Sequence, residues 1–208
     1  MSETFEYVFS TIRGVQAGRE YYVAMCPLGL LSKLFLFDED ELAPEFRAQR
    51  RLNRARIPEM SRYVVKNPDT YAFSAITASV DGDVRFLAID PSRHEAVGTL
   101  HVPMSAQFVI NDGQHRRAAI ERAIEARPEL SDETIAVVLY RDPGLERCQQ
   151  LFADLNRYSI RPTRSLSLLY DHRDEHAQLM KFVVLKSELF RDLVEMEKSS
   201  LSARSRKL

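Results

Sequence analysis

A strand, a tight turn and a helix follow one another directly in one stretch of the chain, and this succession restricts the fold more than any other feature. Phe108–Ile110 has the β-branched and aromatic character of a short buried strand. Ala118–Ala126 favours a helix. We expect Asn111 or Asp112 to cap that helix, and Gly113 to let the backbone approach a ligand closely. The stretch therefore predicts a helix N-terminus suited to binding an anion.

Arg116 falls on the apolar side of that helix. Since a guanidinium keeps its charge in proteins, a partly buried arginine needs a carboxylate or an anionic ligand beside it. One interpretation is a phosphate or nucleotide site, and the other is a structural Asp or Glu that holds Arg116 without any ligand. The ligand-binding residues of the first interpretation are Gly113, Gln114, Arg116 and Arg117.

The turn sequence Asp-Gly-Gln-His-Arg at Asp112–Arg116 resembles the signature of DGQHR-domain proteins, the DndB-like regulators of DNA phosphorothioation, that is, DNA sulfur modification. Tyr71–Ser79, Leu151–Asn156 and Ser165–Asp171 resemble the same family in the same order. The resemblance covers roughly residues 40–175 and implies a role in a phosphorothioation (dnd) gene cluster.

A more distant similarity links the turn to the N-terminal domain of ParB and to sulfiredoxin, where a glycine–arginine turn opens a helix and holds nucleotide phosphates. This similarity implies an α+β fold with a ParB/sulfiredoxin-like mixed sheet and helices in the first two-thirds, followed by a helical C-terminal segment. It also implies a nucleoside triphosphate with Mg²⁺ as the candidate cofactor. The turn holds no cysteine, which excludes sulfiredoxin-type thiol chemistry, and Ala118 replaces the second ParB arginine, which leaves cytidine specificity open.

Basic residues outnumber acidic ones seven to two between Glu45 and Lys66, although the whole chain carries a net charge of −1. Such a segment can neutralise several backbone phosphates, and binding would then fall steeply with salt. The alternative is a solvated helix face, but the family resemblance favours contact with double-stranded DNA. The DNA-binding candidates of this segment are Arg47, Arg50, Arg51, Arg54, Arg56 and Arg62.

A second polar cluster follows the helix expected at Leu145–Asn156. Asn156 is a candidate to orient a phosphate, and Arg161 and Arg164 are further candidates for DNA contact. The alternative is a helix C-terminus with compensating basic residues and a break at Pro162.

Two patterns raise the question of a metal site. His172-Arg-Asp-Glu-His176 fits the His-x-x-Glu-His pattern of inverted zinc peptidases, but such short matches are often accidental, and we assign no metal site. Cys26 and Cys148 are far apart in the sequence and are interpreted as buried thiols.

The chain is expected to form an α/β domain over residues 1–142 and a helical extension over residues 143–208, packed on the first domain or cut short. The expected hairpin joins Tyr71–Val80 to Val84–Ile89, and a β-α-β unit ends at Ile135–Tyr140. The other expected elements are strands Tyr7–Phe9 and Tyr21–Ala24 and helices Leu42–Arg56, Pro58–Lys66, Leu145–Asn156, Ser165–Asp171 and Ala177–Met196.

The chain shows no run of about 18 apolar residues and no signal-peptide pattern, so we expect a cytoplasmic protein without a membrane partner. The favoured function is a DNA-binding transcriptional regulator of a phosphorothioation cluster, controlled by a nucleotide or phosphate ligand at the turn. The alternatives are a weak NTPase, with Asp112 and His115 as its catalytic residues, and a non-enzymatic docking module. Expected partners are operator or modified DNA, other phosphorothioation proteins and a second copy of the chain.

Overall fold

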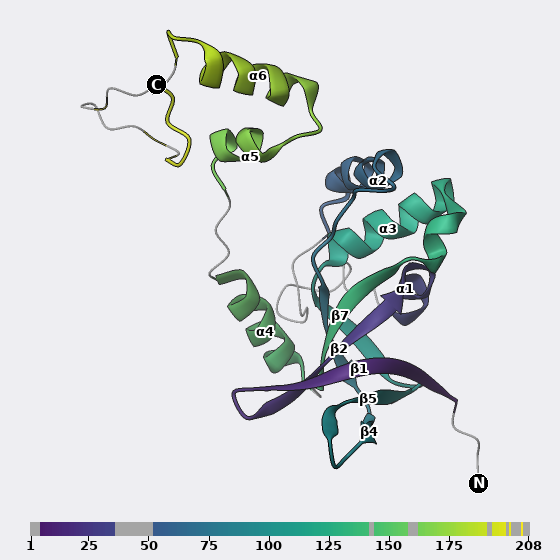
Figure 1. The fold of residues 1–208 in the computed structure, drawn as a ribbon. Helices are drawn as coiled ribbons and strands as arrows, with labels where there is room; N and C mark the ends of the chain where they lie inside the picture. The colour runs from purple at the N-terminus through teal and green to yellow at the C-terminus, as the bar shows by residue number, and fades with distance from the viewer. Residues whose placement is uncertain are drawn as a thin grey trace. The chain divides into compact units, whose positions relative to one another are not determined.

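A computed structural model describes residues 5–35, 52–141, 144–157, 162–190, 193–198, 200 and 205. The contacts divide the chain into two compact units, Met1–Arg157 and Tyr158–Leu208, coloured from purple to yellow in Figure 1. This boundary lies later than the one expected after residue 142, because the helix that follows residue 144 packs with the first unit.

The first unit is built on a seven-stranded mixed sheet with the strand order β4-β5-β1-β2-β7-β3-β6. Among the described residues, β3 pairs with β7 in parallel and every other neighbouring pair is antiparallel. The strands are β1 (Glu6–Gln16), β2 (Arg19–Pro27), β3 (Ile76–Asp81), β4 (Arg85–Asp90), β5 (His94–Pro103), β6 (Gln107–Asp112) and β7 (Thr134–Arg141).

Helices cover the sheet and form a core with it. Ile120 of the central helix α3 joins strand residues such as Leu100 and Ile76 in one buried cluster, together with Leu31 of α1. Helix α2 packs on α3 through a smaller cluster that contains Val64 and Ala123. The helices of the first unit are α1 (Leu28–Leu34), α2 (Ile57–Lys66), α3 (Gln114–Ala126) and α4 (Leu145–Arg157), with 3₁₀ helices η2 (Arg54–Arg56) and η3 (Pro128–Asp132).

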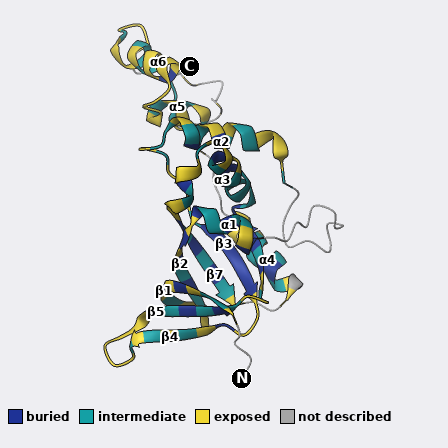
Figure 2. Cartoon of the chain, turned by 90° about the vertical axis from the view of Figure 1, so that its right-hand side faces the viewer, coloured by how far each residue is buried: buried dark blue, intermediate teal, exposed yellow. Residues whose placement is uncertain are grey.

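The second unit contains helices α5 (Arg164–Tyr170) and α6 (Glu175–Lys186). Figure 2 shows buried residues along β3 and β7 of the first unit, whereas α5 and α6 are mostly exposed or intermediate. Among the residues described after Arg157, Ala177 is the one that is buried. The helical character expected for this part is confirmed, but α6 ends at Lys186 rather than at Met196.

The α+β class is confirmed, but two predicted connections are wrong. Strands β3 and β4 do not form a hairpin, because β3 lies between β7 and β6 whereas β4 is an edge strand beside β5. Residues 76–80 of β3 are all buried, which suits a central strand, whereas β4 alternates between exposed and intermediate positions. The β-α-β unit is also wrong: β6 is antiparallel to β3 and β7 is parallel to it, so α3 connects two strands of opposite direction.

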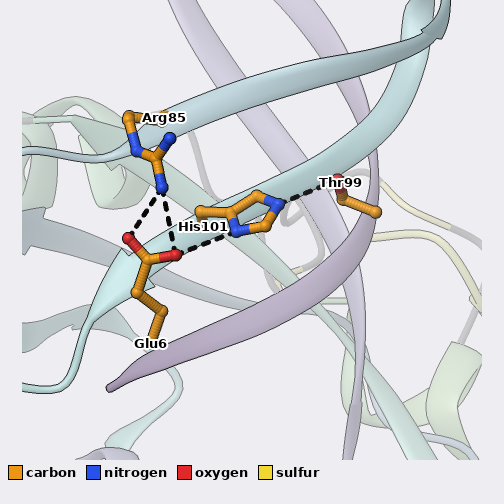
Figure 3. A network of polar contacts seen from close by, with 4 residues as sticks. All are labelled: Glu6, Arg85, Thr99 and His101. Carbon is orange, nitrogen blue, oxygen red and sulfur yellow. Dashed lines mark hydrogen bonds and ion pairs between the residues drawn. The ribbon is translucent and has the colours of Figure 1, made fainter. Parts of the chain in front are cut away.

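Polar side chains join the strands at the β4 edge of the sheet (Figure 3). The Arg85 guanidinium of β4 donates to both carboxylate oxygens of Glu6 in β1, at 2.9 and 3.1 Å. His101 of β5 lies 3.0 Å from the same carboxylate through Nδ1 and 3.2 Å from the Thr99 hydroxyl through Nε2. These contacts connect three neighbouring strands, β1, β5 and β4.

Other expectations are settled in the described part of the chain. The helix that begins near Pro58 is confirmed as α2, whereas most of the helix expected at Leu42–Arg56 lies outside the described residues. Cys26 and Cys148 are free and buried, as expected, and burial raises the pKa of the Cys26 thiol to about 12. No helix in the described residues combines the length and apolar character that a membrane crossing requires.

Candidate functional site

The turn between β6 and α3 depends on Gly113. This residue is the N-cap of α3 and has φ 110° and ψ 10°, a left-handed conformation that favours glycine. A Cβ there would lie 3.0 Å from Arg116 Nη2 and 3.1 Å from Ile76 Cγ1. The expected capping by Asn111 or Asp112 is wrong, because both residues belong to β6 and no side chain caps the helix. The turn therefore brings the start of α3 directly to the end of β6, the edge strand beside β3.

The guanidinium of Arg116 is held by protein groups. Its Nη2 donates to Asp112 Oδ2 at 2.8 Å and to the carbonyl oxygen of Ala75 at 2.9 Å. The side chain is 17% exposed, and its Nε is buried without a hydrogen-bond partner. The arrangement agrees with the structural interpretation of Arg116 in that a carboxylate neutralises its charge.

Asn111 connects the turn to helix α4. Its side chain is fully buried, and its Oδ1 accepts a hydrogen bond from the Ser79 hydroxyl at 2.9 Å. Its Nδ2 donates to the carbonyl oxygen of Cys148 at 3.4 Å. Because Cys148 lies in α4, this amide ties α4 to strands β6 and β3. Helix α4 is thereby positioned with Phe152 and Asn156 at the turn.

His115 connects the same turn to the basic segment. Its Nε2 accepts a hydrogen bond from the backbone N–H of Asn53 at 2.9 Å. Asn53 in turn caps η2, since its Oδ1 accepts from the N–H of Ala55 at 3.2 Å. The accepting nitrogen must be unprotonated, so the neutral ring carries its proton on Nδ1 in this arrangement. No local feature of the sequence indicates this contact, which joins residues 62 positions apart.

A pocket of about 140 Å³ opens where these elements meet. This volume is below the roughly 300–1,000 Å³ of sites for drug-sized ligands, and it suits a single phosphate-sized group. Arg56 gives the pocket a cation that the sequence placed only among the DNA contacts. The lining residues are Arg56, Met60, Asn111, Asp112, Gly113, Gln114, His115, Arg116, Phe152 and Asn156.

The pocket brings together most of the candidates that were expected to bind a phosphate. Gly113, Gln114, Arg116 and Asn156 all line it. Arg117 does not, because its guanidinium pairs with Glu121 at 3.3 Å and its Nε is buried without a hydrogen-bond partner. The contributions of Met60 and Phe152 could not be found from the turn alone, because they arrive through helices remote in sequence.

The candidates for DNA contact are distributed over different parts of the chain. Arg54 and Arg56 form the two ends of η2, and Arg62 lies in α2; all three are exposed. Arg164 is the first residue of α5 and belongs to the second unit. The remaining candidates lie outside the described residues, namely Arg47, Arg50, Arg51 and Arg161.

The histidine pair does not have the geometry of a zinc-peptidase helix. His172 precedes α6, which begins at Glu175, so His172 and His176 do not share one helix face. No group of three or more His, Cys, Asp or Glu side chains suited to a metal ion occurs in the described part of the chain.

Comparison with known proteins gives one match. No curated protein and no solved structure matches the chain, so the likeness to ParB and sulfiredoxin stays a prediction. The model of the DndB family, described as DNA-sulfur modification-associated, matches residues 9–208. This match spans nearly the whole sequence and includes both compact units. The chain therefore belongs to the DndB family and to the proteins associated with DNA sulfur modification.

Proposed function

We propose that this protein is a DNA-binding regulator of a DNA phosphorothioation gene cluster and that an anion in the pocket at the Asp112–Arg116 turn controls its DNA contacts. Family membership supports the biological context. The exposed arginines of η2 and α2 supply positive charge for backbone phosphates, as in other nucleic-acid-binding surfaces. The ParB/sulfiredoxin-like fold is part of the same proposal, since it explains a phosphate site at this turn.

The observation that carries the proposal is the direct link between the pocket and η2. Arg56 belongs both to the basic 3₁₀ helix and to the pocket wall. The backbone of Asn53, just before η2, is bound by His115 at the start of α3. An anion that attracts Arg56 would therefore change the position or the charge of the surface offered to DNA. Two binding events that share a residue are energetically coupled, and each must affect the other.

The size of the pocket favours a phosphate group as the bound portion of the ligand. A nucleoside triphosphate with Mg²⁺ remains the proposed cofactor, with its terminal phosphate in the pocket and its nucleoside outside. Backbone N–H groups at a helix N-terminus and the positive end of the helix dipole favour such a group. Asp112 disfavours an anion, but its charge is offset by Arg116 at 2.8 Å.

Hydrolysis receives less support. The candidates Asp112 and His115 are both engaged, Asp112 with Arg116 and His115 with the Asn53 N–H. A general base must have a free lone pair within hydrogen-bond reach of the attacking water. These residues would first have to exchange their present partners, so we propose binding rather than turnover.

Calorimetric titration with inorganic phosphate, ATP, GTP and CTP, the nucleotides with Mg²⁺, tests the pocket. The variant is Arg56→Ala, and the matched control is Arg62→Ala, which removes another exposed arginine that is not among the residues lining the pocket. We expect saturable binding to the wild type and the control, and its loss in Arg56→Ala. Absence of binding to the wild type would refute the anion site.

Gel shifts with promoter DNA from the gene cluster test the regulator. Both variants should weaken DNA binding and reduce its salt dependence, because each removes one phosphate contact. Only Arg56→Ala should also abolish the effect of the ligand on DNA affinity. If the wild type binds promoter DNA no better than unrelated DNA, the regulator assignment is wrong.

A further inference from the structure

Helix α6 of the second unit exposes four large apolar side chains, Leu179, Met180, Phe182 and Leu185, and two of them are the most exposed. Leu179 is 59% exposed and Phe182 is 66% exposed. Exposed apolar side chains that stand alone are common, but a contiguous apolar patch on a helix marks an interaction site. Among the residues described in this unit, Ala177 alone is buried, so the unit has little core of its own. The exposed face of α6 therefore requires an explanation.

The opposite face of α6 lies toward α5 within the unit. Ala177 and Val184 line a small apolar hollow of about 100 Å³, together with Leu168 and Leu169 of α5. At 100° per residue, Ala177 and Val184 lie on the side of the helix opposite Leu179 and Phe182. Helix α5 thus lies beside one side of α6, where Met180 is still 52% exposed and Leu185 49% exposed, and the Leu179 and Phe182 side faces away from α5.

The exposed side has a regular order of charge. Glu175, Leu179, Phe182 and Lys186 follow one another at spacings of four, three and four residues, which places them in one stripe along the helix. The acidic residue lies in the first turn of α6 and the basic residue in the last turn. We call these four residues the α6 stripe. Its charges have opposite signs at its two ends, with apolar side chains between them.

We propose that the α6 stripe pairs antiparallel with the α6 stripe of a second copy of this chain. A twofold axis across the middle of the helix places Glu175 opposite the partner's Lys186, and Leu179 opposite the partner's Phe182. Each contact occurs twice, as in any isologous interface. Parallel pairing would instead place like charges together at both ends. Antiparallel helices also bring opposite ends of their dipoles together.

Charge complementarity selects a second copy as the occupant. The stripe is complementary to itself after a twofold rotation, because its positive end meets a negative end and its apolar centre meets an apolar centre. A partner of different sequence would have to supply this pattern in reverse. The helix has only 12 residues, so the contact is small, and dimerisation should depend on concentration in the accessible range.

Sedimentation velocity of the full chain over a wide concentration range tests the proposal. The wild type should pass from monomer to dimer, and Phe182→Asp should weaken dimerisation by roughly a hundredfold, because it places a charge at the apolar centre. A wild type that remains monomeric at every concentration would overturn the proposal and leave the stripe to a different partner. A dimer that is unaffected by Phe182→Asp would overturn it as well.

Charge exchange tests the antiparallel register. Glu175→Lys and Lys186→Glu should each weaken dimerisation by about tenfold, because two symmetry-related pairs become repulsive. An equimolar mixture of the two variants should form a heterodimer, and the variant with both exchanges should regain the wild-type affinity. Glu188→Lys is the matched control, since it changes an exposed glutamate by the same charge outside the stripe.

Circular dichroism of each variant checks that α6 still forms. Glu175→Lys removes a favourable charge from the first helical turn, which by itself weakens a helix. That loss cannot be reversed by mixing with Lys186→Glu, whereas the loss of a pairing can. A mixture that behaves as two monomers, or a control that is as weak as the variants, would rule out the antiparallel pairing.

Discussion

The two compact units differ in how they hold their elements together. The first unit has a core to which the strands and helices α1 and α3 all contribute, including the fully buried Leu100 and Ile76. Among the described residues of the second unit, only Ala177 is buried, while Phe182 and Leu189 are largely exposed. Since folding must offset chain entropy with buried apolar surface, the first unit has a much larger source of stability than the described part of the second unit.

Polar groups show the same difference. In the first unit, Asn111 is fully buried and joins two strands to a helix. In the second unit, the polar contacts are mainly local caps. One longer contact joins the Thr163 hydroxyl to the Met196 carbonyl, 33 positions away. The caps are made by the Thr163 hydroxyl, which accepts from the Leu166 N–H, and by Asp174, which accepts from the Ala177 N–H. Caps of this kind define where a helix begins, but they do not fix the position of one helix on another.

The largest effect should come from matched leucine truncations in the two units. Leu100→Ala removes a fully buried side chain and should lower the free energy of unfolding by about 2–5 kcal/mol. Leu179→Ala removes one that is 59% exposed and should change it by less than about 0.5 kcal/mol in dilute protein. Urea denaturation measures both. Equal losses in dilute protein would contradict the comparison.

A matched pair of asparagines separates the two kinds of polar contact within the pocket. Asn111→Ala leaves the buried Ser79 hydroxyl without its acceptor and should cost about 1–3 kcal/mol of unfolding free energy. Asn156→Ala removes an exposed side chain that donates to the Phe152 carbonyl of its own helix, and should cost less than about 0.5 kcal/mol. A double-mutant cycle with Ser79→Ala should show strong coupling to Asn111. Additive effects would exclude the proposed connection between β3 and β6.

Alanine substitutions at three glycines distinguish the cost of backbone strain from the cost of steric crowding. Gly113→Ala should cost about 1–2 kcal/mol, because alanine disfavours φ 110° and its Cβ would lie 3.0 Å from the Arg116 guanidinium. Gly18→Ala has the backbone strain of φ 72° but no atom within 4 Å, so it should cost about 1 kcal/mol or less. Gly144→Ala has neither feature and serves as the control. Thermal unfolding of the three variants ranks their losses of stability. A larger loss of stability in Gly18→Ala than in Gly113→Ala would exclude crowding by Arg116.

The local part of the site could be predicted from the sequence. The strand, the glycine turn and the helix at residues 107–126 depend on neighbours in the chain, so propensity and turn chemistry suffice. The prediction that Asn111 or Asp112 caps α3 is wrong for a specific reason. Asp112 belongs to β6 and its carboxylate accepts a hydrogen bond from Arg116, so Gly113 is the N-cap of the helix. A partly buried cation outweighs the usual preference of aspartate for an N-cap.

The non-local part could not be predicted in the same way. A hairpin between neighbouring segments was expected, but β3 pairs instead with β7 and β6, because a strand buried along residues 76–80 needs neighbours on both edges. The contact of His115 with Asn53 spans 62 positions and involves a backbone N–H, which every residue except proline possesses. Such a donor cannot be recognised from the residue type, so the link between the turn and η2 could be found only in the structure.

Acid should affect the two units through two carboxylates with different surroundings. Hydrogen bonds from Arg85 and then from His101 hold the pKa of Glu6 below its usual 4.5 (Figure 3). The N–H groups of Arg173 and Asp174 hold the pKa of Asp171 below its usual 3.8. In each case the folded pKa is lower than the unfolded one, so the stabilisation is present above the usual pKa and is lost as pH falls through the lowered value.

This pH dependence is the smallest expected effect, because both carboxylates lie near the surface. Each loss of stability in acid is expected in one unit only. Glu6→Gln should flatten the decline in unfolding free energy of the first unit below pH 4.5. Asp171→Asn should flatten the loss of α5 and α6 helicity below pH 3.8, because asparagine keeps an acceptor for the two N–H groups without a charge to titrate. Backbone amide NMR signals followed during an acid titration can resolve the two units. If Glu6→Gln changed the acid response of α6 as much as that of β1, the two units would not respond independently to the charges that stabilise them.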